Sequence, residues 1–586
     1  MQPAFGTSQR SSTLLFNSRD IKYKQPFGAV ATAQRVSIYF PVKKTFNAER
    51  VIMILRRNDH HENFELTKEY SEGNYDMFSL EFAVEREGTY FYRFEIKRGN
   101  TTSFVGRGYN GQAIMGDWLP EWQLSVYEKA YSTPDYFKGG VVYHIFADRF
   151  CHEGEYYPPR YGAAKKWEED VTIIDPDGVY RANDFYGGNF RGIISKLDYL
   201  YKLGVTAIYL SPIFLSNSNH RYDTADYTKI DPMLGTEEEF QALINKAGEK
   251  GISIILDGVF NHTGADSVYF NKFNHFESVG AYQSKKSPYY DWFTFIDFPD
   301  TYKCWWGITV VPTVARDAKG YHELIAGEDG IISKWTDMGV KGWRLDVVDE
   351  LSSEFLKTIT ARIKKCSQDC LVIGEVWEDA TTKHSYGEER EYFRGKELDG
   401  VMNYVFKDSI LEYLNGHDGE LFADQTMTII ENYPKMSLDV CMTLIDSHDT
   451  VRAINALAAK THCSMTKQEK KDFRMTKEQY ADGRKKLKLA SCLQYFLPGV
   501  PSLYYGDEIG MQGFEDPINR RPFSWDNIDK QLLEHYRYLG NLRREHKEDF
   551  CAQAKVTGSG NEVIIERGNI TLKVNAKEIT YEIVIK

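Results

Sequence analysis

Four short acidic segments, each placed directly after an apolar run, constrain this sequence more than any other feature. They are Asp257–His262, Gly342–Asp346, Gly374–Trp377 and Asp446–Asp449. A strand that is buried on both faces is apolar throughout, and a carboxylate just beyond its end loses water unless it meets a polar partner. We therefore expect the four segments to end four strands around one cleft, which can supply both a carboxylate nucleophile and a carboxylic acid proton donor.

The first 130 residues predict a β-sandwich. Short runs alternate apolar and polar residues, as in Arg35–Phe40, Val51–Leu55 and Thr89–Ile96, and Gly, Asn and charged turns separate them. Alternation with a period of two is typical of strands with one buried face, and a series of short strands separated by turns favours a sandwich.

From Val141 the sequence alternates apolar strands with amphipathic stretches such as Thr236–Lys250 and Glu354–Lys365. About eight strands of this kind predict the α/β class and a (β/α)8 TIM barrel, in which active sites form where strands end and loops begin. The expected strands cover residues 141–146, 207–212, 252–258, 342–347, 371–376, 401–404, 441–445 and 501–505.

We expect four parts in the chain, beginning with the sandwich at residues 1–130. The barrel is assigned to residues 131–540. It carries an inserted domain at residues 263–325, after its third strand, because that connection is too long for an ordinary loop. Aromatic residues crowd this insertion at 289–295 and 305–306. Residues 541–586 alternate again and predict a short C-terminal β domain.

The charge balance limits the classes of partner. Lys and Arg total 72 against 84 Asp and Glu, a net charge of −12, so we expect no nucleic-acid partner, which would require cations to neutralise phosphates. No apolar run reaches transmembrane length and Met1–Arg10 lacks a signal-peptide core, so we expect no membrane partner and a cytoplasmic location. The eight cysteines show no regular framework and are expected to be free thiols.

The acidic segments also follow the order of a known family. Over roughly residues 139–525 they resemble the four sequence regions of the α-amylase family, glycoside hydrolase family 13: Asp257-x-x-x-Asn261-His262, Gly342-x-Arg344-x-Asp346, Gly374-Glu375 and His448-Asp449. Asn219–Tyr227, Ser447–Thr450 and Tyr504–Glu508 are similar to the neopullulanase, cyclomaltodextrinase and maltogenic amylase group. The resemblance implies a retaining hydrolase that cleaves α-1,4 bonds of maltooligosaccharides, cyclodextrins, pullulan or starch by double displacement, with some transglycosylation, and an N-terminal domain like a carbohydrate-binding module.

The resemblance assigns the nucleophile to Asp346, the acid/base to Glu375 and the stabilisation of the distorted sugar to Asp449. Arg344 precedes Asp346 by two positions and therefore shares its strand face, where we expect the guanidinium to lower the pKa of that carboxyl. Glu375, beside Trp377, is expected to keep its proton longer. The implied substrate contacts are Tyr222, Asp257, Phe260, His262, Arg344, Trp377, His448, Asp516 and Arg520. Alternatives are a core role for Tyr222, Phe260 or Trp377 and a surface salt bridge between Asp516 and Arg520.

No cofactor is required for this chemistry. Members of the family commonly bind calcium near the first strand, and the matching segments Cys151–Glu155 and Gly187–Asn189 are poor in short carboxylates, so calcium stays an open alternative. The resemblance implies an α-glucan as substrate and a homodimer formed through the N-terminal domain. Two other functions remain open: a non-catalytic glucan-binding member of the same fold, and a glucosyl transferase or phosphorylase.

Overall fold

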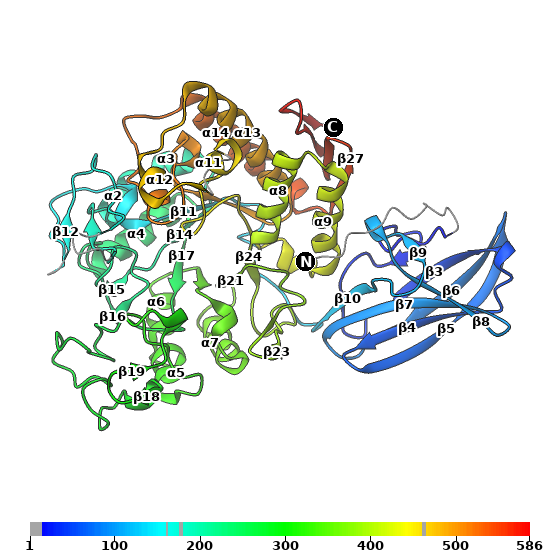
Figure 1. Ribbon diagram of the computed structural model, residues 1–586, viewed down its shortest axis with the longest axis horizontal. Helices are drawn as coiled ribbons and strands as arrows, with labels where there is room; N and C mark the ends of the chain where they lie inside the picture. The colour runs from blue at the N-terminus through cyan, green and yellow to red at the C-terminus, as the bar shows by residue number, and fades with distance from the viewer. Residues whose placement is uncertain (1–13, 160–161, 175–179, 460–463) are drawn as a thin grey trace. The chain divides into compact units, whose positions relative to one another are not determined.

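The computed structural model describes residues 14–159, 162–174, 180–459 and 464–586, which form two compact units (Figure 1). One unit comprises residues up to Tyr131 together with 393–395 and 423–435, and the other holds the rest of the chain. The segment Met1–Arg10, on which the expected location rests, lies outside the described residues. Within the described residues, no helix combines the length and the apolar character that a membrane crossing requires.

The first unit is a β-sandwich, as the alternation of its residues predicts. Its strands follow the order β1-β3-β6-β5-β4-β7-β10-β2, with β8 and β9 attached beyond β7. The long strand β5 pairs with β4 along one half and with β6 along the other, so the sheet folds over on itself. The rings of Phe40 in β3 and Phe94 in β7 then lie 4.4 Å apart in the core. The bounds are β1 Lys24–Gln25, β2 Val30–Ala31, β3 Val36–Lys43, β4 Arg50–Arg57, β5 His60–Glu72, β6 Tyr75–Phe82, β7 Gly88–Arg98, β8 Thr101–Arg107, β9 Ala113–Met115 and β10 Trp122–Tyr127.

Residues from much later in the chain complete this unit. Most of them belong to the helix α9, which spans Gly419–Asn432. Arg19 lies 2.9 Å from Asp424 and 3.1 Å from Glu431, and Arg107 contacts the same Asp424 at 3.2 Å. Arg107 and Asp424 are 317 positions apart. The sandwich therefore includes ion pairs that its own sequence cannot provide.

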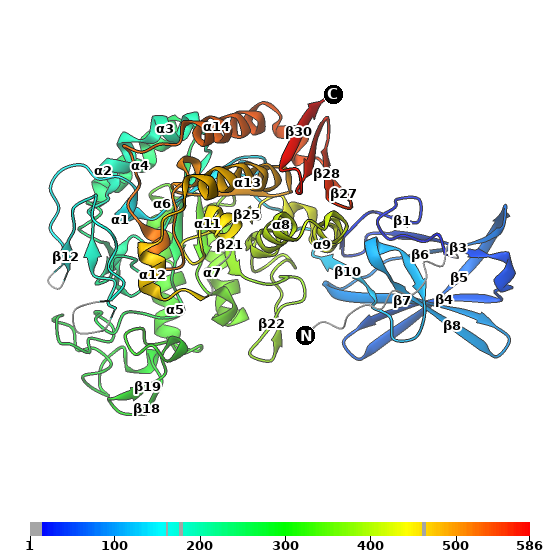
Figure 2. The same cartoon turned by 45° about the horizontal axis from the view of Figure 1, so that its top comes forward.

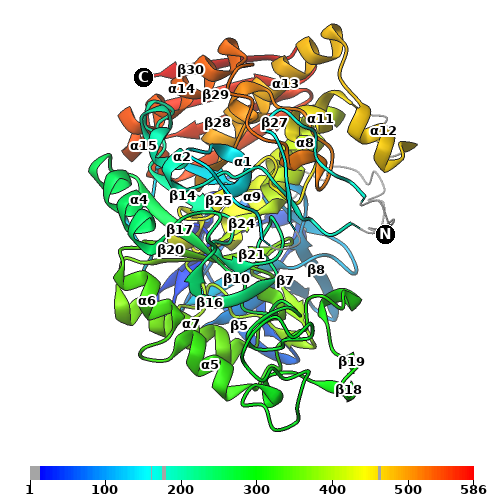
Figure 3. The same ribbon diagram turned by 90° about the vertical axis from the view of Figure 1, so that its left-hand side faces the viewer.

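The second unit is built around a closed barrel of parallel strands, which confirms the predicted fold. Figure 3 shows the strands at the centre of this unit, with α4 and α6 outside them. The barrel strands in order are β11 Val142–Ile145, β14 Ala207–Leu210, β17 Ser253–Gly258, β20 Gly342–Leu345, β21 Leu371–Val376, β24 Gly400–Asn403, β25 Met442–Thr443 and β26 Val500–Tyr504. Helices include α2 Phe190–Ser195, α3 Leu197–Lys202, α4 Glu237–Glu249, α5 Lys319–Ala326, α6 Ile331–Asp337, α7 Ser353–Cys366, α8 Tyr404–Gly416, α11 Ala453–Ala458, α13 Lys477–Phe496 and α14 Lys530–Glu545.

The insertion after β17 contains little regular structure. It carries the two-stranded sheet of β18, Phe295–Asp297, and β19, Thr301–Tyr302, before the chain enters α5. At the other end of the chain, residues 541–545 still belong to α14, and the expected C-terminal strands begin later. They form one antiparallel sheet of β27 Ala554–Ser559, β28 Glu562–Arg567, β29 Ile570–Asn575 and β30 Thr580–Ile585 (Figure 2). Every cysteine among the described residues is a free thiol, as expected.

Close packing between α14 and the end of α3 generates a stability prediction. A Cβ added at Gly540 would lie 1.9 Å from the carbonyl oxygen of Leu203, whereas a Cβ at Gly248 in α4 would meet nothing within 4 Å. We expect Gly540→Ala to destabilise the barrel by about 1–3 kcal/mol through overpacking. Gly248→Ala should leave stability unchanged or raise it, because alanine favours helix by about 1 kcal/mol over glycine. Calorimetric melting of both variants tests this, and equal melting temperatures would contradict it.

Candidate active site

The ends of three neighbouring barrel strands bring the predicted acids together. In β21, Leu371, Ile373 and Glu375 alternate onto one strand face, and the two aliphatic residues belong to the core inside the barrel. The same alternation on β17 places Asp257 two positions beyond the core residue Ile255. The carboxylates therefore form a polar layer next to the apolar core, at the end of the barrel formed by the C-terminal ends of the strands.

Arg344 joins these acids. Its Nη1 donates to Asp346 Oδ1 at 2.7 Å and to Asp257 Oδ1 at 2.9 Å, and its Nη2 lies 3.0 Å from Glu375 Oε2. The guanidinium is fully buried. Because Asp257 pairs directly with Arg344 across β17 and β20, strand register alone brings two of these groups side by side. One cation thus contacts the proposed nucleophile, the proposed acid/base and a third carboxylate.

Burial decides the net effect on Asp346. Loss of water raises the pKa of its carboxyl well above the ordinary value, and the nearby Glu375 and Asp257 act in the same direction against the opposing Arg344. Arg344 acts on this pKa in the expected direction and lowers it, but the loss of water together with the two neighbouring carboxylates outweighs its effect. The sequence identifies the cation but not the depth of burial.

Asp257 is held by hydroxyl groups as well as by Arg344. Tyr209 and Tyr222 both donate to its Oδ2, the second at 2.9 Å. The Tyr222 hydroxyl also lies 2.6 Å from His448 Nε2, and the two rings are stacked with centroids 5.3 Å apart. Tyr209 was not predicted, because in sequence it reads as an ordinary residue of β14. Both side-chain oxygens of Asp257 are therefore occupied by neighbouring side chains.

The two predicted histidines are neutral hydrogen-bonding groups. Burial lowers the pKa of His448 well below its ordinary value and that of His262 to about 4. His262 Nε2 lies 3.1 Å from the carbonyl oxygen of Tyr222. An uncharged imidazole can bind a sugar hydroxyl without adding charge to the cleft. The structure therefore brings His262, Tyr222 and His448 into one wall beside the acids.

Glu375 is fixed by both of its oxygens. The backbone N–H of Val347 donates to Oε2 at 2.9 Å, and the indole N–H of Trp377 donates to Oε1 at 3.1 Å. Val347 has φ of 37°, which is a rare conformation for a β-branched residue. This left-handed turn reverses the chain directly after Asp346 and points its N–H at Glu375. Trp377 is stacked 3.9 Å from Tyr404 and is 42% exposed, so part of its ring faces solvent.

A third acid comes from the loop after β25. The Asp449 side chain is 31% exposed and lies 3.3 Å from His448 Nε2. Arg520 contacts Asp449 at 3.4 Å and Asp516 at 3.0 Å, and its Nε donates to the carbonyl oxygen of His448. Because the Arg520 side chain is buried, this contact differs from an ordinary surface salt bridge. Asp449, Asp516 and Arg520 therefore form a second charged group in the same cleft wall.

A buried carboxyl pair supports this loop. Asp446 and Asp507 are both buried, and burial raises the pKa of each carboxyl group. Asp446 also accepts the backbone N–H of Ala453 at 2.7 Å, while Asp507 accepts Arg452 Nη1 at 2.9 Å. Neither aspartate was predicted as a site residue, although Asp446 begins the fourth acidic segment. The pair links the ends of β25 and β26.

Phe260 differs from the other predicted contacts. It is only 1% exposed, and its ring packs 5.9 Å from Trp343 and 6.0 Å from Tyr227. The structure thus places Phe260 inside the wall of the barrel, where its face is covered by other aromatic rings. This is the core role that the sequence left open as the alternative for this residue.

The residues near the first strand do not fit a calcium ion. Asn189 caps α2 by accepting the N–H of Gly192 at 2.8 Å, and its amide donates to the carbonyl oxygen of Glu153. Its polar atoms are therefore engaged in folding this segment. Among the described residues, no group of three or more His, Cys, Asp or Glu side chains is arranged to hold a metal.

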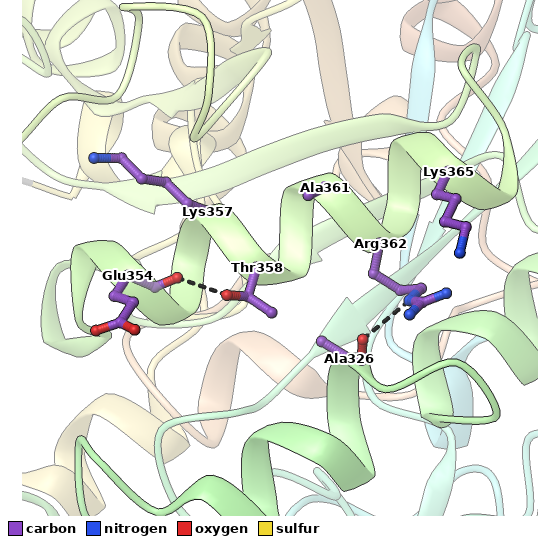
Figure 4. Close-up of a pocket in the computed structure, with 7 residues that line it drawn as sticks. All are labelled: Ala326, Glu354, Lys357, Thr358, Ala361, Arg362 and Lys365. Atoms are coloured by element: carbon purple, nitrogen blue, oxygen red, sulfur yellow. Dashed lines mark hydrogen bonds between the residues drawn. The ribbon is translucent and has the colours of Figure 1, made fainter.

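A groove of about 440 Å³ lies away from the acids, along the solvent side of α7 (Figure 4). Its cations already have partners. Arg362 donates to the carbonyl oxygen of Ala326, Lys357 pairs with Glu391 at 2.6 Å and Lys365 pairs with Glu328 at 3.4 Å. None of the predicted site residues lines this groove.

Comparisons with known proteins agree with this geometry. An amylopullulanase from Thermoanaerobacterium saccharolyticum is 32% identical over 94% of this chain and 46% of its own length. A cyclomaltodextrinase from Geobacillus thermopakistaniensis is 33% identical over 71% of this chain and 64% of its own. The chain thus spans less than half the length of the amylopullulanases that it matches.

Among solved structures, the type III pullulan hydrolase from Thermococcus kodakarensis matches with a TM-score of 0.66 and 25% identity, covering 96% of this chain and 94% of that one. The protein family described as alpha amylase, catalytic domain, matches residues 145–317 and 323–557 of this chain. These ranges contain the barrel strands from β14 to β26 in full and every acid of the cleft. The chain therefore belongs to the α-amylase family.

Proposed function

We propose that this chain is a retaining α-glucan hydrolase that cleaves α-1,4-glucosidic bonds by double displacement. The observation that supports this most is the contact of Arg344 with both Asp346 and Glu375, at 2.7 Å and 3.0 Å. A retaining glycosidase needs two carboxyl groups held close together in opposite protonation states. The shared guanidinium fixes the two groups in place, and their crowding opposes the ionisation of both at once.

In the proposed first step, an Asp346 oxygen attacks the anomeric carbon while the bond from that carbon to the leaving oxygen breaks. Glu375 gives its proton to the leaving oxygen. In the second step, Glu375 removes a proton from water as the water oxygen attacks the same carbon, which releases Asp346. Asp449 lies in the cleft wall and stabilises the positive charge that develops on the sugar in the transition state.

The neighbouring groups position the sugar at the cleavage point. The half-buried Tyr222 offers its ring as a stacking surface, and His262 and His448 bind hydroxyl groups as neutral imidazoles. Asp257 orients Arg344 and Tyr222. Asp516 and Arg520 bind the sugar on the non-reducing side, and Trp377 contacts the side of the leaving group.

The substrates that we propose are maltooligosaccharides, cyclodextrins, pullulan and starch, because relatives named cyclomaltodextrinase, neopullulanase and amylopullulanase are 32–33% identical to this chain. The decisive experiment is a product profile on β-cyclodextrin, pullulan and soluble starch, with proton NMR of the first product. The α-anomer should appear first. Initial release of the β-anomer would exclude double displacement, and no release from any of the three substrates would exclude the hydrolase.

Two other functions are less well supported. A non-catalytic glucan-binding protein would not need the complete set of Asp346, Glu375, Asp449 and Arg344. A transferase or phosphorylase would use the same first step, but it would pass the sugar to an acceptor other than water. The product profile separates these outcomes, because only hydrolysis generates reducing ends in proportion to cleavage.

We further propose that the protein acts in the cytoplasm as a homodimer formed through the N-terminal sandwich. A sandwich has two faces, and exposed aromatic residues such as Phe104 and Trp118 offer apolar surface on this unit. Light scattering of the full chain measures the association state, and a monomer at micromolar concentration would contradict the dimer.

The nucleophile is tested with Asp346→Asn, which keeps the shape of the side chain but cannot form the glycosyl ester. We expect turnover to fall on the order of a thousandfold or more. Because burial raises the pKa of Asp346, its ionised form opposes folding at neutral pH, so the variant should melt no lower than the wild type. Asp526→Asn, at an exposed position, is the control and should change neither quantity. Retention of about one-tenth of the activity by Asp346→Asn would reject the assignment.

The acid/base is tested with Glu375→Gln on two substrates that differ in their leaving groups. Loss of activity on maltoheptaose should exceed the loss on α-glucosyl fluoride by about a hundredfold, because fluoride departs without a proton. Glu354→Gln, on the solvent side of α7, is the control and should behave like the wild type. Equal losses on both substrates would show that Glu375 is not the proton donor.

A further inference from the structure

A buried arginine that no step of the proposed mechanism uses binds the turn that follows the nucleophile. Arg390 comes directly after β23, Glu388–Glu389, and is only 2% exposed. Its Nη1 donates to the carbonyl oxygen of Leu351 at 2.9 Å, and its Nη2 donates to that of Val348 at 3.2 Å. These two carbonyl groups lie at the two ends of the short helical turn η5, Val348–Glu350. One guanidinium therefore spans the whole turn.

The chain enters this turn in a conformation that needs support. Val347, which directly follows Asp346, has φ of 37°, a value that β-branched residues rarely adopt. Strained backbone of this kind persists where the surrounding contacts fix it, and it is concentrated at functional sites. The turn itself contributes a bond from the N–H of Glu350 to the carbonyl oxygen of Val347, at 2.9 Å. We therefore expect the two side-chain bonds from Arg390 to help keep this conformation.

The conformation matters because it directs one backbone donor at the proposed acid/base. The N–H of Val347 donates to Glu375 Oε2 at 2.9 Å. The turn also packs directly against β21, since a Cβ added at Gly374 would lie 2.9 Å from Cγ1 of Val348. Gly374 immediately precedes Glu375 in that strand. A shift of the turn would therefore move this donor away from Glu375.

The neighbours of Arg390 contact the same turn through its one buried-side acid. Lys383 Nζ lies 3.0 Å from the carboxylate of Asp349, and the hydroxyl of Tyr392 donates to the same carboxylate. The backbone N–H of Arg390 donates to the carbonyl oxygen of Lys383 at 2.8 Å, which closes the hairpin between them. The guanidinium of Arg390 lies 5.1 Å from the ring centroid of Tyr392. The hairpin and the turn are thus joined by side chains on both.

A second buried arginine makes the same kind of contact far along the chain. Arg567 in β28 is fully buried, and it donates to the carbonyl oxygen of Phe496 at 3.0 Å and to that of Phe550. These carbonyl groups belong to α13 and to α15, Lys547–Cys551, which carry none of the predicted site residues. Arg567 therefore matches Arg390 in burial and in bonding, but it does not contact the turn after the nucleophile.

We propose that Arg390 is a positioning residue for proton donation by Glu375. Through the two carbonyl groups of η5 it keeps the N–H of Val347 on Glu375 Oε2, which fixes the carboxyl group where it meets the leaving oxygen. Arg390 acts through the turn and not through contact with the sugar. This inference rests on the proposed hydrolase activity, because it names a residue that orients the acid/base of that same site.

The test compares Arg390→Met with the matched control Arg567→Met, and each change removes a buried guanidinium but keeps a long side chain. The value of kcat/KM is measured on maltoheptaose and on α-glucosyl fluoride, whose leaving group departs without a proton. Arg390→Met should lower kcat/KM about tenfold to a hundredfold on maltoheptaose and less than about fivefold on the fluoride. Arg567→Met should lower both by the same factor, because it changes only the fraction of folded protein.

Amide hydrogen exchange provides a measurement that does not need turnover. Peptides that cover residues 347–351 should exchange about tenfold faster in Arg390→Met than in the wild type, and Arg567→Met should match the wild type there. If Arg390→Met does not fold, Arg390→Lys takes its place with the same expected directions. Its ammonium group keeps the charge but lacks the planar fork that reaches two carbonyl groups at once.

Each result bears on the role of Arg390. Equal losses on the two substrates would show an ordinary structural contribution and would overturn the positioning role. Unchanged exchange at residues 347–351 would show that the turn does not depend on Arg390, which overturns it as well. If the wild type hydrolyses neither substrate, the proposed function fails, and the exchange comparison still decides whether Arg390 holds the turn.

Discussion

The site depends on one buried guanidinium. Arg344 contacts carboxylates that come from three strands, and removal of this guanidinium would cost about 3–5 kcal/mol because three buried carboxylates would lose their compensating charge. The acids in turn require this cation, since the core residues below them, such as Ile255 and Ile373, are apolar and offer no polar partner. Fold and site are therefore not separable here: the strand register that closes the barrel is also what places Asp257 beside Arg344.

The loops around this centre are held by a second set of polar contacts. Asn519 donates to the carbonyl oxygens of His448 and Thr450, at 2.7 and 2.8 Å, and Arg520 adds a bond to the first of these. The loop that carries Asp449 is thus tied by its backbone to the segment after β26. A side chain that must contact a transition state is positioned more precisely when hydrogen bonds hold its backbone in place.

Much of this arrangement could be predicted from the sequence, for a physical reason. Buried parallel strands are continuous apolar runs, so their positions and the acids beyond their ends can be read directly, as with Ile252–Asp257 in β17. Other features depend on burial, which sequence does not reveal. Burial determines the net pKa shift of Asp346 and explains why the ring of Phe260 is covered. It also distinguishes the packed aromatic residues near 289–295 from the more exposed pair Trp305 and Trp306. Tyr209 was missed because a tyrosine within a strand gives no sign of the carboxylate that it meets.

The ion pairs between the sandwich and α9 also affect how this protein is made. Asp424 leaves the ribosome 317 residues after Arg107, which at 5–20 residues per second corresponds to a delay of roughly 15–60 s. During that time the nascent sandwich carries Arg19 and Arg107 without their carboxylate partners. Completion of the first unit must therefore wait until most of the barrel has been translated. A fragment that ends near residue 131 would lack these ion pairs. The boundary of an independent first unit therefore does not coincide with the end of the N-terminal strands.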